Sequence, residues 1–372
     1  MMITAMTRRS ALRAMMLAAS TSVLAVAATG AQGADAKKIV FLVNGNLGDK
    51  SYFDLGAKGM DLVKQKYGDQ VETKVIEMGT DQTKWLPTFQ DVSEQDYDLI
   101  IACTFEISDI MAEVAPEYPD KTYVLIDGVM PYDKGDYGNV YSVVYKQNEG
   151  SYLAGIFAAS LLKDGVVPGS QGTSLGFLGG MDIPIINDFL VGYVEGAQSV
   201  TPDIKIAISY AGTFNDAAKG KELALAQYRA GTAIGFNVAG LTGVGQLAAA
   251  KEADKWALGV NSDQELIFKD SDPAMAAKVA TSMLKKVDVT LARTYDLFLE
   301  GKLPIGTVEA IGLKEEAVGL AETGNMATLA PPALKQKLDE AKVGIISGAI
   351  KVSSGFAIDQ AALDKMRTAV RP

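Results

Sequence analysis

Residues 41–60, FLVNGNLGDKSYFDLGAKGM, decide the fold class, because they describe a strand, a Gly-rich turn and a helix in succession. The same arrangement returns at residues 176–197, GFLGGMDIPIINDFLVGYVEGA. In each copy an apolar run breaks at the turn, and an aromatic residue followed by spaced glycines opens the helix. Two such units in one chain predict two similar α/β lobes that face each other across a small-ligand cleft.

Strand and helix patterns alternate along the chain from residue 37. Several of the predicted strands are continuous apolar runs, which is typical of parallel strands buried on both faces. We expect strands at 39–43, 71–77, 99–103, 123–126, 140–144, 174–178, 205–210, 233–238, 256–260 and 306–311. We expect helices, among others, at 53–66, 149–162, 217–228, 246–252 and 276–298. This alternation predicts an α/β protein with doubly wound parallel sheets.

Residues 1–36 have the features of an export signal. Three arginines precede an acid-free apolar run at 14–28, and Ala34-Asp35-Ala36 offers a cleavage site. The run is too short and too rich in Ala for a comfortable membrane span. The arginine pair leaves the twin-arginine and general secretory routes both open. Because no lipidation cysteine follows the signal, we expect a free periplasmic protein, cleaved near Ala36.

Composition excludes several classes of function. The net charge is −10, and it becomes −12 without the three arginines and one aspartate of the leader, so a nucleic acid partner is disfavoured. The absence of histidine excludes Ser-His-Asp and Cys-His nucleophile systems and His zinc sites, while carboxylate-only enzymes remain possible. The single cysteine, Cys103, lies in an apolar run, where we expect a buried small apolar residue. We expect neither a metal nor a cofactor.

The chain that follows the leader is too long for one comfortable core, so size alone predicts two lobes. No low-complexity linker separates them, and we expect direct crossings at strand ends, the first after Tyr145. The predicted partition gives lobe 1 as 37–145 plus about 280–304, lobe 2 as 146–279 plus about 305–350, and a C-terminal segment as 351–372.

Two turns at strand ends carry an aromatic residue. Tyr52 ends the turn NGNLGDKSY after the first strand, and Phe214 lies in YAGTFND after a strand of the second unit. Ligands of open α/β sheets bind at the carboxyl ends of strands, so two rings on opposed lobes could grip a planar heterocycle. Each ring could also be a core aromatic, and the sequence alone leaves both roles open.

Polar residues and glycines follow other predicted strands. Asp127 ends YVLID, Asp263 lies in GVNSDQ, and Lys285 lies in TSMLKK, which we expect to open the long helix. Carboxylates and an ammonium near the cleft could hold a polyhydroxylated ligand, or they could form surface ion pairs. The run AGLTGVG at 239–245 matches no phosphate-loop pattern, and a tight turn or a close ligand approach explains it better.

These motifs resemble the basic membrane protein or purine nucleoside receptor A-like substrate-binding proteins of ABC transporters. The resemblance runs from about residue 38 to 348 and rests on GDKSYFD, YVLID, GGMDIPIINDFLVGYVEGA, YAGTFNDAAKGKELA, FNVAGLTGVG, GVNSDQ and TSMLKKVDV. It implies a type I periplasmic-binding fold with a nucleoside, in characterised members, held between the lobes. It also implies an inner-membrane ABC permease as partner, and we expect the protein to be a monomer.

The resemblance also implies roles for single residues. Tyr52 and Phe214 match the two aromatics that stack on the base, and Asp127 matches a cleft acid. Asn44 stands where the family usually has Asp, and Tyr52 stands where it usually has Phe. Since Asn donates as well as accepts, the identity of the base stays open. The positions that match sugar-holding residues are Gly240, Asp263 and Lys285.

Three other functions remain possible. The same fold could bind a free purine base or a sugar-like ligand. A carboxylate-dependent glycoside hydrolase would use a pair such as Asp127 and Asp263, although nothing in the sequence marks a general acid. A transcriptional regulator on this fold is disfavoured by the acidic charge and by a leader in place of a DNA-binding segment. We therefore expect a binding protein and not an enzyme.

Overall fold

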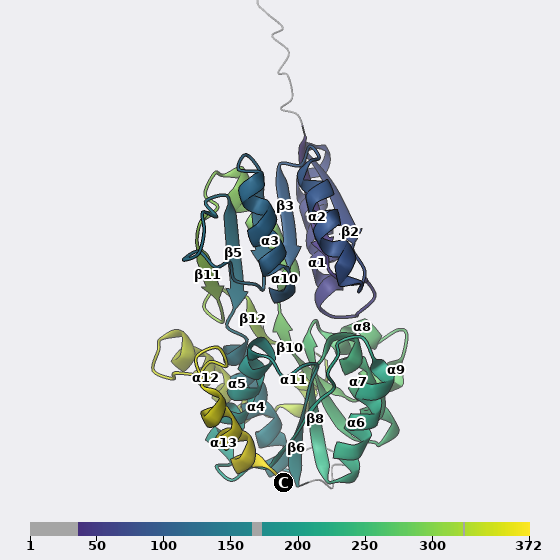
Figure 1. Ribbon diagram of the computed structural model, residues 1–372. Coiled ribbons are helices and arrows are strands. Elements are labelled where there is room, and N and C mark those ends of the chain that lie inside the picture. Colours follow the sequence, from purple (N-terminus) through teal and green to yellow (C-terminus); the bar gives the residue numbers. More distant parts are fainter. Residues whose placement is uncertain (1–35, 166–172, 323) are drawn as a thin grey trace, which may run out of the picture. The chain divides into compact units, whose positions relative to one another are not determined.

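The computed structural model describes residues 36–165, 173–322 and 324–372. Apart from Ala36, the predicted export signal lies outside the described residues. From residue 37 on, the described chain forms two six-stranded sheets with helices on both sides of each sheet (Figure 1). This arrangement confirms the predicted α/β class with doubly wound, mainly parallel sheets.

The first sheet contains only parallel neighbours. Its strand order is β11-β5-β4-β3-β1-β2. Because β3 and β4 are covered by helices on both faces, nearly all their residues are buried, which explains their unbroken apolar sequence. The strands are β1 (Lys37–Val43), β2 (Val71–Glu77), β3 (Leu99–Cys103), β4 (Thr122–Ile126), β5 (Val140–Tyr145) and β11 (Val308–Ile311).

The second sheet has the same plan with one antiparallel edge. Its strand order is β12-β10-β9-β8-β6-β7, and β12 runs antiparallel to β10. All seven residues of β8 are buried, so the middle of this sheet is also covered on both faces. The strands are β6 (Ser174–Gly179), β7 (Ile206–Tyr210), β8 (Thr232–Val238), β9 (Trp256–Asn261), β10 (Val279–Lys285) and β12 (Val318–Leu320).

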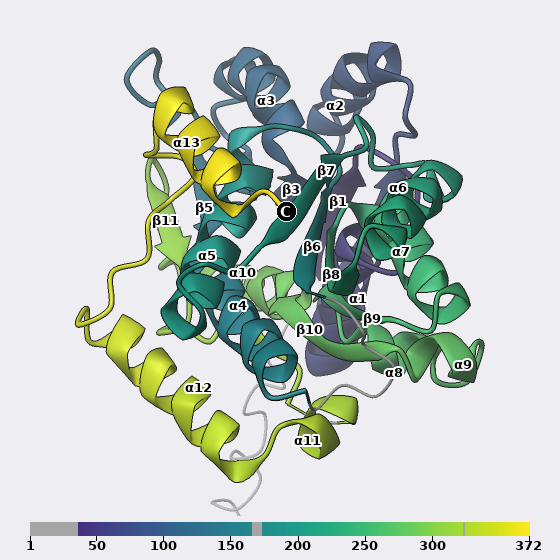
Figure 2. The same cartoon turned by 90° about the horizontal axis from the view of Figure 1, so that it is seen from below.

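Helices pack in pairs on the sheets (Figure 2). The contacting pairs include α1 with α10 and α2 with α3 beside the first sheet, and α4 with α5 and α6 with α7 beside the second. The helices are α1 (Tyr52–Tyr67), α2 (Trp85–Ser93), α3 (Ser108–Val114), α4 (Gln147–Lys163), α5 (Pro184–Val200), α6 (Ala217–Arg229), α7 (Gly240–Glu252), α8 (Gln264–Phe268), α9 (Pro273–Ala276), α10 (Val287–Leu299), α11 (Asn325–Leu329), α12 (Pro332–Ile346) and α13 (Gln360–Val370).

Side chains of β1 alternate between two cores, as the period of a strand requires. Phe41 belongs to a cluster with residues of α1 and α10, whereas Leu42 belongs to a cluster with Phe89 of α2 and Met111 of α3. Both faces of the first sheet are therefore apolar, and polar groups concentrate at the strand ends. Cys103 is fully buried in the first of these clusters, as predicted.

Strand pairing differs from the predicted partition at two places. β10 lies in the segment 280–304 expected with the first lobe, yet it pairs with β9 in the second sheet. β11 lies in the segment 305–350 expected with the second lobe, yet it pairs with β5 in the first sheet. The chain crosses between the sheets after β5, after β10 and after β11. An isolated apolar run does not specify which sheet it joins, so the sequence could not assign these two strands to their sheets.

The predicted helix at 276–298 is wrong in its first half. Residues Val279–Lys285 form β10, and only Val287–Leu299 form a helix, α10. The run VATSMLK fits a helix by composition, but its backbone pairs with β9 and β12 and nearly all of its residues are buried. Lys285 therefore ends a strand and does not lie in a helix.

Candidate functional site

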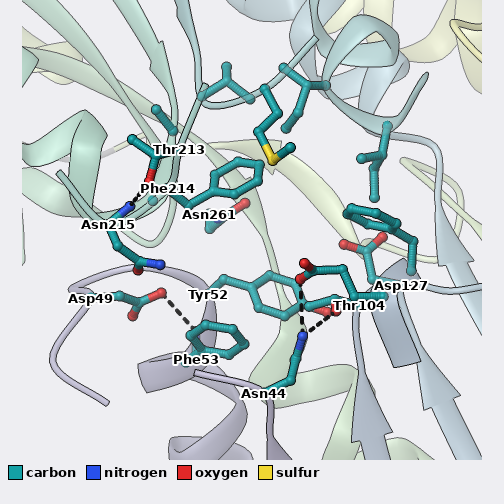
Figure 3. Close-up of a pocket in the computed structure, with 18 of the residues that line it drawn as sticks. Asn44, Asp49, Tyr52, Phe53, Thr104, Asp127, Thr213, Phe214, Asn215 and Asn261 are labelled. Carbon is teal, nitrogen blue, oxygen red and sulfur yellow. Dashed lines mark hydrogen bonds between the residues drawn. The ribbon is translucent and has the colours of Figure 1, made fainter. Parts of the chain in front are cut away.

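A cavity of about 320 Å³ lies at the carboxyl ends of strands from both sheets (Figure 3). Sites for small organic ligands usually span roughly 300–1,000 Å³, so this volume suits a small molecule. Each of six strands contributes a wall residue that ends it or directly follows it: Asn44, Thr104, Asp127, Ala239, Asn261 and Lys285.

Six of the seven predicted site residues line this cavity: Asn44, Tyr52, Asp127, Phe214, Gly240 and Lys285. The described lining does not include the seventh, Asp263. Its carboxylate Oδ1 accepts a hydrogen bond from the backbone N–H of Leu266 at 3.1 Å and so caps α8. Asp is a favoured residue at a helix start, and Asp263 occupies that position in α8.

Aromatic rings enter the cavity from both sheets. Phe214, from the turn between β7 and α6, lies above Tyr52 and Phe53 of α1 in the close-up (Figure 3). A Cβ atom at Gly180 would overlap the Phe214 ring, so the glycine makes room for that ring. Gly240, in the left-handed region at φ 55°, begins α7 beside Phe214. The cavity therefore has aromatic faces on two sides, between which a planar ring would fit.

Tyr52 is held by its hydroxyl group. The hydroxyl donates to the carbonyl oxygen of Ile126 at 3.3 Å. Burial, together with the nearby negative charge of Asp127, raises the pKa of Tyr52 well above its ordinary value. The phenol therefore stays neutral at physiological pH, and its ring presents an uncharged surface to the cavity.

A buried ion pair connects the two sheets at the cavity wall. Lys285 Nζ, at the end of β10, lies 2.5 Å from Asp127 Oδ2, which follows β4. The exposed fractions of the two side chains are 3% and 7%. Lys285 Nζ also lies 4.9 Å from the ring centre of Tyr145 and 5.4 Å from that of Phe189. A buried ammonium requires such partners, because it loses its hydration.

A second polar group of the wall surrounds Asn44. Its Nδ2 donates to Thr104 Oγ1 at 2.8 Å and to Glu106 Oε2 at 3.1 Å. Burial raises the pKa of Glu106, although the hydrogen bond from Asn44 opposes the shift. The sequence singled out Asn44 as a ligand contact, but it gave no sign of Glu106, which lies 62 residues away.

Asp49 is the third carboxylate beside the cavity, and it organises the start of α1. It accepts hydrogen bonds from the backbone N–H groups of Ser51 at 3.0 Å, Phe53 at 3.0 Å and Asp54 at 3.2 Å. Burial raises its pKa, and these three bonds oppose the shift. A carboxylate at a helix N-terminus is stabilised by the free N–H groups there, so this one fixes the first turn that carries Tyr52.

Backbone strain is concentrated at the cavity. The described chain has six residues other than glycine with positive φ, and three of them are Thr104 (71°), Asp127 (64°) and Asn261 (63°). All three line the cavity at the ends of β3, β4 and β9. This conformation costs of order 1–3 kcal/mol per residue and gathers at functional sites, so these three residues make the cavity the candidate functional site.

Asn261 is a wall residue that the sequence reasoning missed. Its Nδ2 donates to Ser51 Oγ at 2.9 Å, while its Oδ1 is buried and has no hydrogen-bond partner among the described residues. An unpaired buried acceptor is costly, so this oxygen suits a ligand that donates a hydrogen bond to it. The signal was its position as the last residue of the strand WALGVN, whereas Asp263 was chosen for its charge and for the family resemblance.

Among the described residues, no helix has the length and apolar character needed to cross a membrane. The family model described as ABC transporter substrate-binding protein PnrA-like, Bmp, matches residues 36–354. The ABC transporter nucleoside-binding protein BmpA of Lactococcus lactis subsp. cremoris (strain MG1363) is 35% identical over 276 residues, which are 72% of this chain and 74% of that protein. Basic membrane protein D of Borreliella burgdorferi (strain JD1) is 30% identical over 324 residues, which are 86% of this chain and 88% of that protein.

The fold also resembles that of a solute-binding protein of known structure. A crystal structure of an ABC transporter solute-binding protein from Aeropyrum pernix K1 matches with a TM-score of 0.76 and 26% identity, and the match covers 90% of this chain and 98% of that one. The fold is thus the type I periplasmic-binding fold, and the resemblance inferred from the sequence motifs is confirmed. The chain belongs to the Bmp family of PnrA-like ABC transporter substrate-binding proteins.

Proposed function

We propose that the protein binds a nucleoside, most simply a purine nucleoside, in this cavity and delivers it from the periplasm to an inner-membrane ABC permease. The observation that carries the proposal is the composition of the wall, which combines aromatic rings from both sheets with the buried Asp127–Lys285 pair. The relative from Lactococcus lactis, whose name states nucleoside binding, supports the same ligand class.

The aromatic part of the wall suits a planar base. A base that enters between Phe214 on one side and Tyr52 or Phe53 on the other would be covered on both faces. Each stacked ring contributes about 1–3 kcal/mol to binding, so two rings supply a large part of the affinity of a small ligand.

The polar part of the wall suits the hydroxyl groups of a sugar. A hydroxyl both donates and accepts, so it can pair with the Asp127 carboxylate and with the Lys285 ammonium. The unpaired Oδ1 of Asn261 offers a further acceptor. We place the third sugar contact at Asn261 and not at Asp263, because Asn261 lines the cavity and Asp263 caps α8.

Charge argues for a nucleoside over a nucleotide. The ionisable acids of the described wall are Asp49, Glu106 and Asp127, and the one base is Lys285. This excess of carboxylates disfavours a phosphate group, which would enter with about two negative charges.

The direct test is mass spectrometry of the small molecules released when the purified protein is denatured, followed by calorimetric titration of the ligand-free protein. We expect a nucleoside to be recovered and to bind at one site, and its 5′-monophosphate to bind at least roughly 10-fold more weakly. Failure of all common nucleosides to bind would disprove the proposal. Equal binding of a free base and its nucleoside would favour the free-base alternative.

A further inference from the structure

Glu106 differs from the other carboxylates of the cavity in its partners. It lies in a short 3₁₀ turn, η3 (Phe105–Ile107), directly after the strained residue Thr104. Its Oε2 accepts from Asn44 Nδ2 at 3.1 Å, and its Oε1 accepts from Gln82 Nε2 at 3.3 Å. Both of these described partners are neutral amides, so neither neutralises the charge of the carboxylate.

The other two carboxylates are compensated. Asp127 contacts the Lys285 ammonium at 2.5 Å. Asp49 accepts from three backbone N–H groups at the start of α1. A carboxylate has about four lone-pair sites, and the two amides occupy two sites of Glu106. Glu106 therefore keeps acceptor capacity on a cavity wall where its charge is not balanced.

Asn44 holds this carboxylate in place. Both protons of its Nδ2 are used, one by Thr104 Oγ1 and one by Glu106 Oε2, and its Oδ1 accepts from the Cys103 thiol at 3.7 Å. The reversed amide would set its oxygen against the Glu106 carboxylate, so the orientation is fixed by its neighbours. Asn44 is thus a positioning residue, and the group that it positions is an acceptor.

We propose that Glu106 recognises two adjacent N–H donors on the base, the N1–H and 2-amino groups of a guanine-type purine. This inference rests on the proposed nucleoside function and names the base. Hydrogen bonds to an ionised carboxylate are shorter and stronger than neutral ones, so the two donors of a guanine edge gain the most binding free energy from Glu106. Hypoxanthine lacks the 2-amino donor, and adenine presents the N1 lone pair, which the carboxylate repels. The expected order of affinity is guanosine, then inosine, then adenosine.

The experiment is calorimetric titration of the ligand-free, full-length mature protein with guanosine, inosine, adenosine and guanine. The variant is Glu106→Gln, and the matched control is Glu113→Gln, which makes the same change at an exposed site on α3 outside the cavity lining. We expect Glu106→Gln to weaken guanosine binding by roughly 10- to 100-fold and to bring the guanosine-to-inosine affinity ratio close to one. The control should leave both affinities unchanged, and thermal melting should show that both variants are folded.

The outcomes separate this inference from the proposed function. Nucleosides that bind with equal affinity, or a guanosine-to-inosine ratio that Glu106→Gln leaves unchanged, would overturn the role of Glu106 and leave nucleoside binding intact. Guanine that binds as tightly as guanosine would overturn the proposed sugar contacts, and a guanosine-to-inosine ratio that Glu106→Gln brings close to one would still support the role of Glu106. Failure of every purine to bind would overturn both.

Discussion

The residues of the cavity are fixed before any ligand arrives. Thr104, Asp127 and Asn261 all have positive φ, which costs of order 1–3 kcal/mol each, and they persist because buried strands and hydrogen bonds determine their neighbours. Asp127 is additionally held by Lys285, and Asn261 by Ser51. A wall that is already ordered loses little entropy on binding, so more of the interaction energy appears as affinity.

At the residue scale, Phe214→Ala should weaken nucleoside binding by about 10-fold or more, because a stacked aromatic contributes about 1–3 kcal/mol. Isothermal titration of the ligand-free protein measures this change. Phe356→Ala is the matched control, because that ring is 54% exposed and is not part of the described cavity lining. An unchanged affinity in Phe214→Ala, or an equal loss in the control, would show that Phe214 does not stack on the ligand.

Single residues of the site were predictable from the sequence where chemistry depends on strand ends alone. Asn44 and Asp127 directly follow apolar strands that the sequence located, so their place at the sheet edge followed from the fold class. Glu106 was not found, because its role depends on a hydrogen-bond partner distant in sequence, Asn44. No local pattern records such a pair, whereas Asn261 did have a local signal, its place at the end of β9.

At the scale of elements, spaced glycines set the distance between helices. A Cβ atom at Gly192 of α5 would overlap the carbonyl oxygen of Asn148, and one at Gly196 would overlap that of Tyr152. Both acceptors lie on α4, so the two helices meet with their backbones in contact. The last two glycines of the motif GFLGGMDIPIINDFLVGYVEGA therefore serve helix packing, while its Gly-rich turn lines the cavity at Met181.

Gly196→Ala should lower the free energy of unfolding by roughly 1–3 kcal/mol. Alanine is the better helix former by about 1 kcal/mol, but overpacking against a backbone oxygen costs more than this gain. Urea unfolding monitored by circular dichroism measures the change. Gln198→Ala, a substitution on the same helix at a partly exposed site, should change stability by less than about 0.5 kcal/mol. Stabilisation by Gly196→Ala would contradict the close packing of α4 and α5.

Most strands were predictable because parallel strands buried on both faces have distinctive continuous apolar runs. The predicted bounds of β2 and β3 match those observed, Val71–Glu77 and Leu99–Cys103. β10 was not predictable, since residues 279–285 suit a helix by composition and become a strand only between β9 and β12. Tertiary context decided that element, and local propensity did not.

At the scale of the whole molecule, one buried carboxylate connects segments distant in sequence. Asp188 of α5 accepts from the backbone N–H of Asn148 at 3.3 Å, near the first crossing between the sheets. It also accepts from the Ser354 hydroxyl and from the Gly355 N–H, both at 2.7 Å. The C-terminal segment is thereby fixed to the second lobe, and Arg367 of α13 adds an ion pair to Asp182 at 2.5 Å.

This carboxylate should make stability depend on pH. Burial raises the pKa of Asp188 from 3.8 to about 6, although hydrogen bonds from Ser354, Gly355 and Asn148 oppose the shift. Between about pH 4 and 6 the folded protein therefore holds a proton that the unfolded chain has released, so this group's contribution to stability falls as pH rises. Asp188→Asn removes that dependence. Relative to that of the unmutated protein, the free energy of unfolding of the variant should rise by on the order of 2–3 kcal/mol between pH 4 and pH 7.

Urea unfolding of both proteins at several pH values tests this expectation, and Asp182→Asn provides a control of opposite sign. Burial raises the pKa of Asp182, but the hydrogen bonds from Arg367 and Asn187 outweigh it and leave that pKa below its ordinary value. The stability that Asp182 contributes is then present above its unfolded pKa and is lost as pH falls through its folded pKa. Relative to the unmutated protein, the free energy of unfolding of Asp182→Asn should therefore be lowest near neutrality. That of Asp188→Asn should be highest there. A stability difference for Asp188→Asn that stays constant from pH 4 to pH 7 would show that this carboxylate is ionised throughout and that its hydrogen bonds outweigh its burial.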